Sequence, residues 1–441
     1  MNQLRYGFFS AYRRIFAVTF TINIAAMIVM IILRVHSRNY FSYSDAATAT
    51  GANVAAAVIM RHEHFVNILF RAATAFPYST PLCIRRHAAR IYSYGGVHTA
   101  CGVSASFWYI FFIVLLAIDF NGPEFSSARV ESYLIASFAG VILAVLIVIM
   151  ALSHPSYRIK HHDAWEMSHR FGGWTVTAFF WAQTIVSIVV TAKHTGQSTG
   201  LTLAKTPLFW LLVVITACLI YPWLRLRKRE VEATQLSDHA LKLTFTHKDA
   251  HHPGMATRLS DAPLKETHGF AVIPTDKFTG EDDGYECIIS NAGNWTKKMI
   301  ENPQTHVWVK GTLGFGALNV VSLFKPVVVV ATGSGIAPCL SFLRPHGAHT
   351  GYPLRVLWSA RNPEETYGPG ILRTVTRADP AAVIIDTKKT GTPNMTALSY
   401  ALYRESHCEA VMIISNAKVT REVVYGLESR GIPAFGAIFD S

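Results

Sequence analysis

The stretch that decides the fold is Val327-Val-Val-Val-Ala-Thr-Gly-Ser-Gly-Ile-Ala-Pro338, an apolar run that ends in a glycine-rich turn. The run followed by Gly333 and Gly335 predicts a buried strand that turns sharply into a helix, and Pro338 suits the first turn of that helix. Glycines let a backbone approach a pyrophosphate closely, and a helix N-terminus offers N–H donors and a favourable dipole. The stretch predicts a dinucleotide-binding turn; taken alone, it is also compatible with a purely structural turn.

The sequence around this turn alternates between strands and helices. After residue 325, apolar strands are predicted at Val327–Ala331, Leu354–Ser359, Val383–Asp386 and Val411–Ser415, and helices at Met395–Glu405 and Thr420–Arg430. This alternation is typical of a doubly wound parallel sheet. Upstream, short alternating runs predict an antiparallel β domain. These runs are Leu241–Thr246, Gly269–Ile273, Glu286–Ser290 and Val307–Lys310.

The chain as a whole is more apolar than a soluble protein, which indicates that part of it lies in lipid. Hydrophobic residues make up 51% of the chain and charged residues 15%, whereas a soluble domain carries about 25% charged residues. Six apolar segments have roughly the length that crosses a bilayer, and Arg61, His62, Glu63 and His64 interrupt the second. The segments lie near 15–35, 52–72, 97–118, 132–152, 170–192 and 207–224. We expect an α-helical membrane bundle of six spans, with domain limits at 1–228, 229–322 and 323–441.

Basic residues at the ends of the spans predict the orientation. They are concentrated on one side, whereas the stretch 119–131 carries Asp119, Glu124 and Glu131. Cytosolic loops are enriched in Lys and Arg, so we expect an integral, multi-pass protein with both termini in the cytosol. The sequence does not indicate which membrane. The basic residues are Arg5, Arg13, Arg14, Arg71, Arg85, Arg86, Arg90, Arg158, Lys160, Arg225, Arg227, Lys228 and Arg229.

Charge and cysteine content exclude several classes of function. The formal net charge is +12, but its clustering at span ends indicates a lipid bilayer as partner and no nucleic acid. The six cysteines form no CxxC pair, which argues against a disulfide framework, a zinc site or an iron–sulfur cluster. The first apolar run lacks a small-residue cleavage site, so it is expected to be an anchor and not a cleaved signal peptide.

Four further motifs accompany the glycine turn in a defined order. His268-Gly-Phe-Ala271 matches two positions of an HPFT motif, and Gly293-Asn-Trp-Thr296 matches three positions of GDWT. Gly311-Thr-Leu-Gly314 resembles a GPFG turn, and Gly391-Thr-Pro-Asn394 resembles a GRPN segment. Together they resemble the branch of the ferredoxin–NADP reductase superfamily that includes NADPH oxidases and ferric reductases.

Over nearly the whole chain the sequence is similar to the TmpA-like integral membrane flavoproteins. The residues that carry this resemblance are Arg61-His-Glu63, Asn67, Gly95-Gly-Val-His98, His169-Arg-Phe-Gly-Gly-Trp174 and the C-terminal stretch 431–441. The resemblance implies a cytosolic ferredoxin-reductase-like module. It would consist of an antiparallel β-barrel that binds FAD and a doubly wound α/β domain that binds NAD(P)H.

The resemblance also implies which residues bind the cofactors. For FAD these are His268, Gly269, Phe270, Ala271, Gly293, Asn294, Trp295 and Thr296. Gly311 and Gly314, in the turn that precedes the nucleotide sheet, are further cofactor-binding candidates. For the nicotinamide dinucleotide they are Thr332, Gly333, Ser334, Gly335, Ile336, Pro338, Ser359 and Arg361. Phe439 is expected either to cover the flavin or nicotinamide or to be a buried anchor.

Two features bear on how the cofactors are used. Ser359, Arg361, Lys388 and Lys389 follow sheet strands; they either bind a 2′-phosphate, which favours NADPH over NADH, or form a solvated basic edge. Three positions depart from the family pattern: Gly269 replaces a proline, Asn294 an acid, and Ser415-Asn-Ala417 a Cys-Gly-Pro segment.

His98 and His169 are candidate ligands of one b-type haem. They open the third and fifth predicted spans, and two facing imidazoles can fill both axial positions of haem iron. The oxidase branch carries a second histidine pair further along these helices, where this chain has Phe111 or Phe112 and Ala182 or Gln183. We therefore expect one haem or none, and no two-haem path across the membrane.

The sequence as a whole predicts an NAD(P)H-dependent oxidoreductase that passes electrons through FAD to an unidentified acceptor. Residues 61–64 could pair among themselves, receive substrate or relay protons. One alternative is a haem-free enzyme that acts on a membrane-associated small molecule. The other is a degenerate reductase that serves as a membrane sensor or signalling scaffold.

Overall fold

The computed structural model describes residues 10–37, 41–246, 251–275, 284–349 and 353–437. The chain divides into two compact units. The helical unit comprises residues 12–62 and 94–221. The α/β unit comprises residues 63–93 and 222–441, together with the first residues of the chain. Each unit is described separately below.

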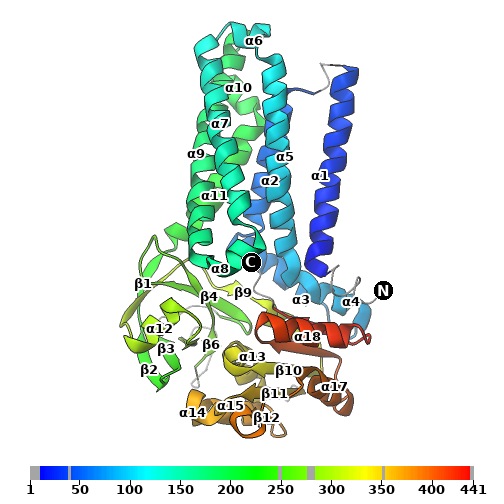
Figure 1. The fold of residues 1–441 in the computed structure, drawn as a ribbon, viewed down its shortest axis with the longest axis vertical. Helices are drawn as coiled ribbons and strands as arrows, with labels where there is room; N and C mark the ends of the chain where they lie inside the picture. Colours follow the sequence, from blue (N-terminus) through cyan, green and yellow to red (C-terminus); the bar gives the residue numbers. More distant parts are fainter. Residues whose placement is uncertain (1–9, 38–40, 247–250, 276–283, 350–352, 438–441) are drawn as a thin grey trace. The chain divides into compact units, whose positions relative to one another are not determined.

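The helical unit is built from long apolar helices that run side by side (Figure 1). Helices α2 and α5, α7 and α9, and α5 and α7 pack against each other around a core that includes Tyr109, Phe112, Ile135 and Leu212. Helix α1 has no buried residue, as expected for a helix that faces lipid. The helices are α1 (Ala11–His36), α2 (Tyr43–Ile59), α5 (Gly95–Asp119), α6 (Pro123–Ser126), α7 (Arg129–Leu152), α8 (Pro155–Lys160), α9 (His162–Thr195), α10 (Thr199–Lys205) and α11 (Pro207–Leu224).

Within the described residues, five helical stretches are long and apolar enough to cross a membrane. They are Ala11–His36, Leu82–Asp119, Arg129–Leu152, His162–Thr195 and Pro207–Leu224. The prediction of a span near 52–72 is wrong. Helix α2 ends at Ile59 after 17 residues, and a separate 12-residue helix, α3, begins at Glu63.

The first part of the α/β unit is antiparallel, as the sequence predicts. One sheet has the order β1-β8-β4-β5 with β9 paired to β4, and the other has the order β2-β3-β7-β6. Both sheets contribute to one core, which includes Leu243, Leu259, Cys287 and Val309. The strands are β1 (Arg227–Glu230), β2 (Glu232–Ser237), β3 (Ala240–Phe245), β4 (Met255–Ser260), β5 (His268–Ala271), β6 (Ile273–Pro274), β7 (Tyr285–Ser290), β8 (His306–Val309) and β9 (Gly314–Phe315). Helix α12 (Asn294–Glu301) follows β7.

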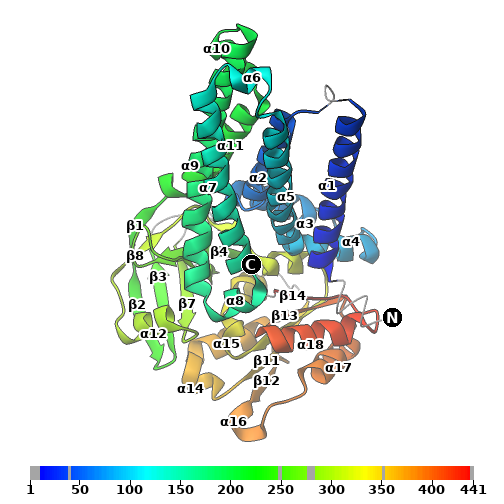
Figure 2. The same cartoon turned by 45° about the horizontal axis from the view of Figure 1, so that its top comes forward.

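The second part is a parallel sheet with the order β12-β11-β10-β13-β14, seen most clearly in Figure 2. Val327 to Val330 of β10 are all fully buried; since their side chains alternate between the faces, both faces of the sheet are covered. The prediction of a doubly wound sheet is confirmed. The strands are β10 (Val327–Thr332), β11 (Leu354–Ala360), β12 (Val383–Asp386), β13 (Ala410–Ile414) and β14 (Ala434–Gly436). The helices are α13 (Ile336–His349), α14 (Pro363–Tyr367), α15 (Pro369–Ala378), α16 (Thr387–Thr390), α17 (Met395–Glu405) and α18 (Ala417–Glu428); short 3₁₀ turns η3 (Ala317–Leu323) and η4 (Gly333–Gly335) flank β10.

The segment 63–93 belongs to the α/β unit, although it is distant from the rest of that unit in sequence. It contains α3 (Glu63–Thr74), α4 (Leu82–Ala88) and η2 (Ala89–Tyr94). The buried Arg85 guanidinium donates two hydrogen bonds to the Glu409 carboxylate, at 2.7 and 2.8 Å, and one to the Leu323 carbonyl oxygen at 2.8 Å. Arg86 and Arg90 each pair with Glu428 at 2.9 Å. Three of the arginines that the sequence suggests as orientation signals therefore also hold this segment on the α/β unit.

Candidate functional site

A large cavity of the α/β unit lies at the carboxyl ends of the parallel strands. The order of the strands reverses between β10 and β13, and ligands of such sheets bind in the crevice at that point. The cavity has a volume of about 710 Å³. Its lining residues come from the ends of β10, β11 and β13, from α14 and from the β2–β3 turn: Ser237, Asp238, His239, Thr332, Gly333, Ser334, Arg361, Asn362, Glu365, Thr366, Tyr367 and Asn416.

The glycine turn predicted from the sequence forms one wall of this cavity. Gly333 has a φ of +52°, a conformation that favours glycine, and a Cβ there would find only the Tyr367 hydroxyl, at 3.9 Å. Its carbonyl oxygen accepts a hydrogen bond from the Trp358 indole at 3.1 Å. The hydroxyls of Thr332 and Ser415 are hydrogen-bonded to each other. The turn is thus held in place by Trp358 and Ser415, and the Cα of Gly333 faces the cavity.

Four of the predicted nucleotide-binding residues support this wall without lining the cavity. A Cβ at Gly335 would collide with the Ile414 carbonyl oxygen, so glycine is needed there for close packing of the turn on β13. Ile336 is fully buried, and Ser359 is 5% exposed. Pro338 lies in the first turn of α13, the position that proline prefers.

The segment after β11 contributes charged residues to the cavity. Arg361 and Glu365 both line the cavity, and Asn362, with a φ of +45°, donates its side-chain N–H to Glu365 at 2.6 Å. The Asp386 carboxylate accepts hydrogen bonds from the backbone N–H groups of Asn362 at 2.9 Å and Lys388 at 3.0 Å. The Asn362 N–H is the main cause that lowers the pKa of Asp386. This carboxylate is therefore committed to backbone N–H groups of the segments that follow β11 and β12.

Several lining residues were not found by sequence reasoning. Tyr367, which is 4% exposed, reaches the cavity only through the fold of α14. Ser237 comes from the antiparallel part and donates its hydroxyl to the Thr366 carbonyl oxygen at 2.7 Å. Asn416 could have been predicted from the sequence, because Ser415-Asn-Ala417 stands where the related family has a Cys-Gly-Pro segment near the nicotinamide.

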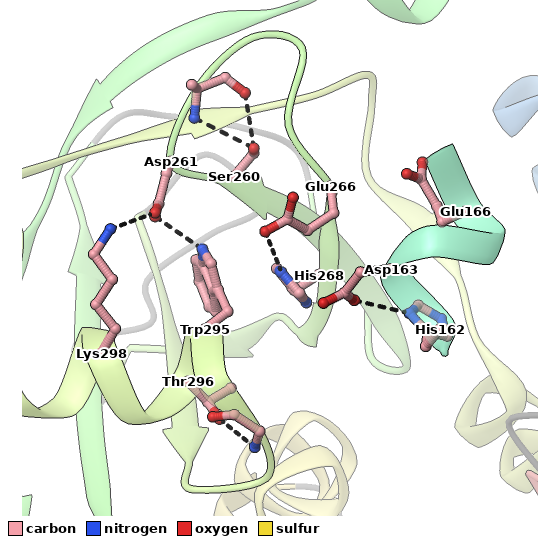
Figure 3. Close-up of polar contacts among 12 residues, drawn as sticks. His162, Asp163, Glu166, Ser260, Asp261, Glu266, His268, Trp295, Thr296 and Lys298 are labelled. Carbon is pink, nitrogen blue, oxygen red and sulfur yellow. Dashed lines mark hydrogen bonds and ion pairs between the residues drawn. The ribbon is translucent and has the colours of Figure 1, made fainter. Parts of the chain in front are cut away.

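The predicted flavin residues form an aromatic cluster between β5 and α12 (Figure 3). The rings of His268 and Trp295 stack with centroids 4.4 Å apart, and Phe270 lies 5.7 Å from Trp295. The Trp295 indole N–H donates to Asp261 Oδ1 at 2.8 Å, and Lys298 pairs with Asp261 Oδ2 at 2.8 Å. Gly269 and Ala271 are the neighbouring residues of β5.

The N-terminus of α12 is shaped by Thr296. Its hydroxyl oxygen accepts hydrogen bonds from the backbone N–H groups of Ala292 and Gly293, each at 2.9 Å. Asn294 is the first residue of the helix, and the first turn contains no acidic residue. Such an N-terminus favours an anionic ligand, although the Thr296 hydroxyl is already committed to its own turn.

The turn at Gly311–Gly314 is occupied by side chains of α3. The Glu63 carboxylate, 6% exposed, accepts hydrogen bonds from the Thr312 N–H at 2.6 Å and the Thr312 hydroxyl at 2.9 Å, and forms an ion pair with Arg258. Asn67 donates to the Leu313 carbonyl oxygen at 2.9 Å and accepts from the Phe315 N–H at 2.8 Å. The sequence suggests ion pairing, substrate binding or proton relay for residues 61–64. These contacts show that Glu63 forms an ion pair, and that its partners are distant in sequence.

His98 and His169 face each other in the helical unit. Their ring centroids lie 6.1 Å apart with the ring planes at 62°. His98 Nδ1 is 2.8 Å from the Ala57 carbonyl oxygen; because a carbonyl only accepts, Nδ1 carries the proton and Nε2 keeps its lone pair. Gly102 and Gly173 follow the two histidines by one helical turn, and a Cβ at either position would meet nothing within 4 Å.

The positions where a second haem pair would lie are closely packed. Gln183 accepts a hydrogen bond from the Tyr109 hydroxyl at 3.0 Å and donates to the Ile135 carbonyl oxygen at 3.1 Å. Phe112 is 2% exposed and stacks with Tyr109. This half of the bundle is filled by its own side chains. The remaining predicted residue, Phe439, lies outside the described residues.

Comparison with solved structures finds proteins of the reductase type. A ferredoxin–NADP⁺ reductase from Neisseria gonorrhoeae with bound FAD and NADP is 16% identical; the match covers 48% of this chain and 98% of that structure, with a TM-score of 0.37. The ferredoxin reductase of carbazole 1,9a-dioxygenase is 13% identical, over 48% of this chain and 70% of that structure, with a TM-score of 0.39.

Comparison with characterised sequences finds two relatives over the entire chain. Residues 317–441 match the family model "Adenylate-forming reductase 03009, C-terminal domain". Adenylate-forming reductases 06235 and 03009 of Coprinopsis cinerea (strain Okayama-7 / 130 / ATCC MYA-4618 / FGSC 9003) are each 42% identical over 100% of this chain. The chain spans 41% of the length of each relative. Over its full length, the chain is therefore a homologue of part of two reductases.

Proposed function

We propose that the protein is a membrane-bound oxidoreductase that takes electrons from NADPH through FAD and passes them to an acceptor in or at the membrane. The observation that carries this proposal is the 710 Å³ cavity at the strand-order reversal, which is lined by both the Gly333 turn and Arg361. A name that includes "reductase" for proteins 42% identical to this chain supports a redox role.

The charges around the cavity favour NADPH over NADH. NADH is commonly recognised by an acid that binds the ribose 2′-hydroxyl, and NADPH by an arginine that binds the 2′-phosphate. Asp386 uses its carboxylate for the N–H groups of Asn362 and Lys388, whereas the Arg361 side chain lines the cavity. Two other acids line the cavity: Glu365, whose carboxylate accepts a hydrogen bond from Asn362, and Asp238 of the β2–β3 turn.

FAD would lie against the aromatic cluster, with its pyrophosphate at the N-terminus of α12. Phe270, His268 and Trp295 supply flat surfaces, and the first turn of α12 supplies N–H groups without opposing acids. When bound, FAD accepts a hydride from the nicotinamide and releases electrons singly. The chain contributes placement: it fixes the Gly333 turn through Trp358 and fixes Trp295 through Asp261.

The helical unit fits a membrane anchor with a cytosolic α/β unit. Five helical stretches of the described residues have the length and apolar character of spans, and α2, with 17 residues, is at the lower limit of spanning length, about 17 residues. With α2 as a sixth crossing, Arg13 and Arg14 in the first turn of α1 and the basic residues after α11 would place both ends of the helical unit in the cytosol.

His98 and His169 fit the axial ligands of a single haem b. His98 is oriented by Ala57, and the open positions at Gly102 and Gly173 leave room beside both rings. A haem held there would supply single-electron transfer. The packing of Tyr109, Phe112 and Gln183 opposes a second haem, which favours an acceptor within the bundle or at the end of it that carries His98 and His169.

The proposal is tested by nucleotide specificity. The full chain, purified in detergent with FAD, should oxidise NADPH with a lower KM than NADH, and Arg361→Gln should raise the KM for NADPH about tenfold while leaving NADH almost unchanged, because an arginine–phosphate contact contributes about 1.5–3 kcal/mol. Arg377→Gln, an exposed arginine at the end of α15, is the matched control. Absence of flavin and of binding to either nucleotide in folded protein would favour a sensor or scaffold instead.

A further inference from the structure

The α/β unit contains a second cavity, of about 340 Å³, which no part of the proposed electron path uses. It is lined by Arg71 of α3, His252 and Pro253 before β4, Phe315 of β9, Asn319 and Ser322 of η3, and Phe342 of α13. None of these residues lines the 710 Å³ cavity. Its size lies within the range of small-molecule sites, about 300–1,000 Å³.

Helix α3 contributes Arg71 to this cavity, and the spacing of polar residues along the helix explains why. Glu63, Asn67 and Arg71 are four residues apart and share one face of the helix. Glu63 and Asn67 use their polar atoms to bind the turn at Thr312–Phe315. Arg71 lies over the ring of Phe315, 5.9 Å from its centroid, and no carboxylate of the described residues pairs with it. The cavity is therefore lined by an exposed cation without a paired anion.

The ring of Phe315 gives the cavity a flat wall. The imidazole of His252 lies nearly parallel to it, with centroids 6.1 Å apart and planes at 21°. Phe342, which is 1% exposed, adds a second aromatic surface. The loop before β4 is held in place, because the Gly316 N–H donates to the Gly254 carbonyl oxygen at 2.8 Å. These aromatic walls fit a planar apolar group, such as an aromatic ring, better than a small hydrated ion.

Asn319 supplies an acceptor that the protein leaves unused. Its side-chain N–H points to the Pro253 carbonyl oxygen at 3.5 Å, which orients the amide. The Oδ1 atom is buried and has no hydrogen-bond partner among the described residues. A buried acceptor without a partner costs about 1–3 kcal/mol. A ligand with a hydroxyl or N–H donor would remove that cost.

We propose that this cavity binds a small aromatic hydroxycarboxylate. The carboxylate pairs with Arg71, the ring lies along Phe315 and His252, and the hydroxyl donates to Asn319. The site is separate from the nicotinamide and flavin sites, so it does not depend on the proposed electron path.

The test uses 4-hydroxybenzoate and the full chain in detergent, with binding followed by saturation-transfer NMR and by calorimetry. Arg71→Gln should weaken binding about tenfold or more, since the charged contact contributes about 1.5–3 kcal/mol. Arg377→Gln, the same change at an exposed arginine outside the cavity, should have no effect, and equal melting temperatures will establish that both variants are folded. Asn319→Leu should weaken 4-hydroxybenzoate and leave benzoate unchanged.

Two further probes examine the charge and the ring of the ligand separately. The neutral analogue 4-hydroxybenzamide should bind much more weakly than the acid, and inorganic phosphate should not compete. Equal binding by the amide would overturn the role of Arg71, and competition by phosphate would overturn the need for a planar ring. Displacement of 4-hydroxybenzoate by FAD or NADPH would show that the cavity is part of a cofactor site and would contradict the proposal.

Discussion

Two glycine turns of the α/β unit look alike in sequence and differ in what they face. Gly333 and Gly311 both have positive φ, +52° and +74°, and both resemble cofactor turns. A side chain at Gly333 would project into a cavity. A side chain at Gly311 would collide with the Glu63 carboxylate. The first turn is available to a ligand, and the second is already filled by the protein itself.

The two turns show that a glycine can leave space either for a ligand or for a side chain from another part of the same chain. At Gly311, the occupant is a buried carboxylate from a segment that enters the α/β unit about 250 residues earlier in sequence. That segment is held by Glu63 and Asn67 at one end and by Arg85, Arg86 and Arg90 at the other. Substitutions at the two turns should therefore separate stability from nucleotide binding.

The largest effect is expected for Glu63→Ala. Removal of the carboxylate leaves Arg258 without its ion-pair partner and the Thr312 N–H without an acceptor, and loss of one member of a buried pair costs about 3–5 kcal/mol. The melting temperature of the full chain should fall steeply. Glu301→Ala, which removes an exposed i,i+4 pair with Lys297, should leave it nearly unchanged. Similar melting temperatures for both variants would contradict the assignment of Glu63 as a buried anchor.

The next effect concerns Arg85 and its dependence on pH. Burial acts to raise the pKa of Glu409, but the bonds from Arg85 and from the Lys325 N–H prevail and lower it below its usual 4.5. A lowered folded-state pKa stabilises the protein above the unfolded pKa, and this stabilisation is lost as the pH falls through the folded value. Arg85→Gln should cost about 2 kcal/mol near neutral pH.

This pH dependence can be measured as the melting temperature of each protein at a series of pH values between about pH 3 and pH 8, a range that includes the titration of a carboxyl group. The difference between the wild-type chain and Arg85→Gln should be constant near neutral pH and should shrink below about pH 4. A difference that persists unchanged in acid would mean that packing of the Arg85 side chain, and not its charge pair, stabilises the segment.

The smallest effect on stability is expected for Gly333→Ala. The left-handed backbone costs an alanine about 1–2 kcal/mol, but the new methyl group enters open space. Binding should suffer as well as folding: the methyl group occupies the surface that a pyrophosphate approaches, so the Kd for NADPH should rise about tenfold. Titration of protein fluorescence with NADPH measures this change. A Gly333→Ala variant with a lowered melting temperature but an unchanged Kd for NADPH would show that Gly333 serves the fold, as Gly311 does, and not nucleotide binding.

The parallel sheet could be predicted from the sequence because its signals are local. The apolar run of β10 ends in its own glycine turn, and the predicted limits of β12 and α17 coincide with those observed, Val383–Asp386 and Met395–Glu405. The antiparallel runs were found for the same reason. Alternation and turn residues lie within each strand and its immediate neighbours.

The segment from Val54 to Ser93 could not be predicted in the same way. Its apolar residues and its arginines are typical of membrane spans and their ends, and the partners that explain them are far away in sequence. Glu63 bonds to Thr312, Arg85 to Glu409, and Arg90 to Glu428. The cavity residues Asn362 and Tyr367 were missed for a related reason, because only closure of the sheet brings them beside Gly333.

The measurement that tests the central claim most directly is an anaerobic absorption spectrum of the purified full chain, before and after NADPH and then after dithionite. Our account predicts flavin bands that are bleached by NADPH, and bleached much more slowly in Gly333→Ala. A Soret band that shifts on reduction and is lost in His98→Ala would add the haem; its absence would leave the flavin assignment intact. Folded protein that carries no flavin and shows no spectral change with NADPH would contradict the account.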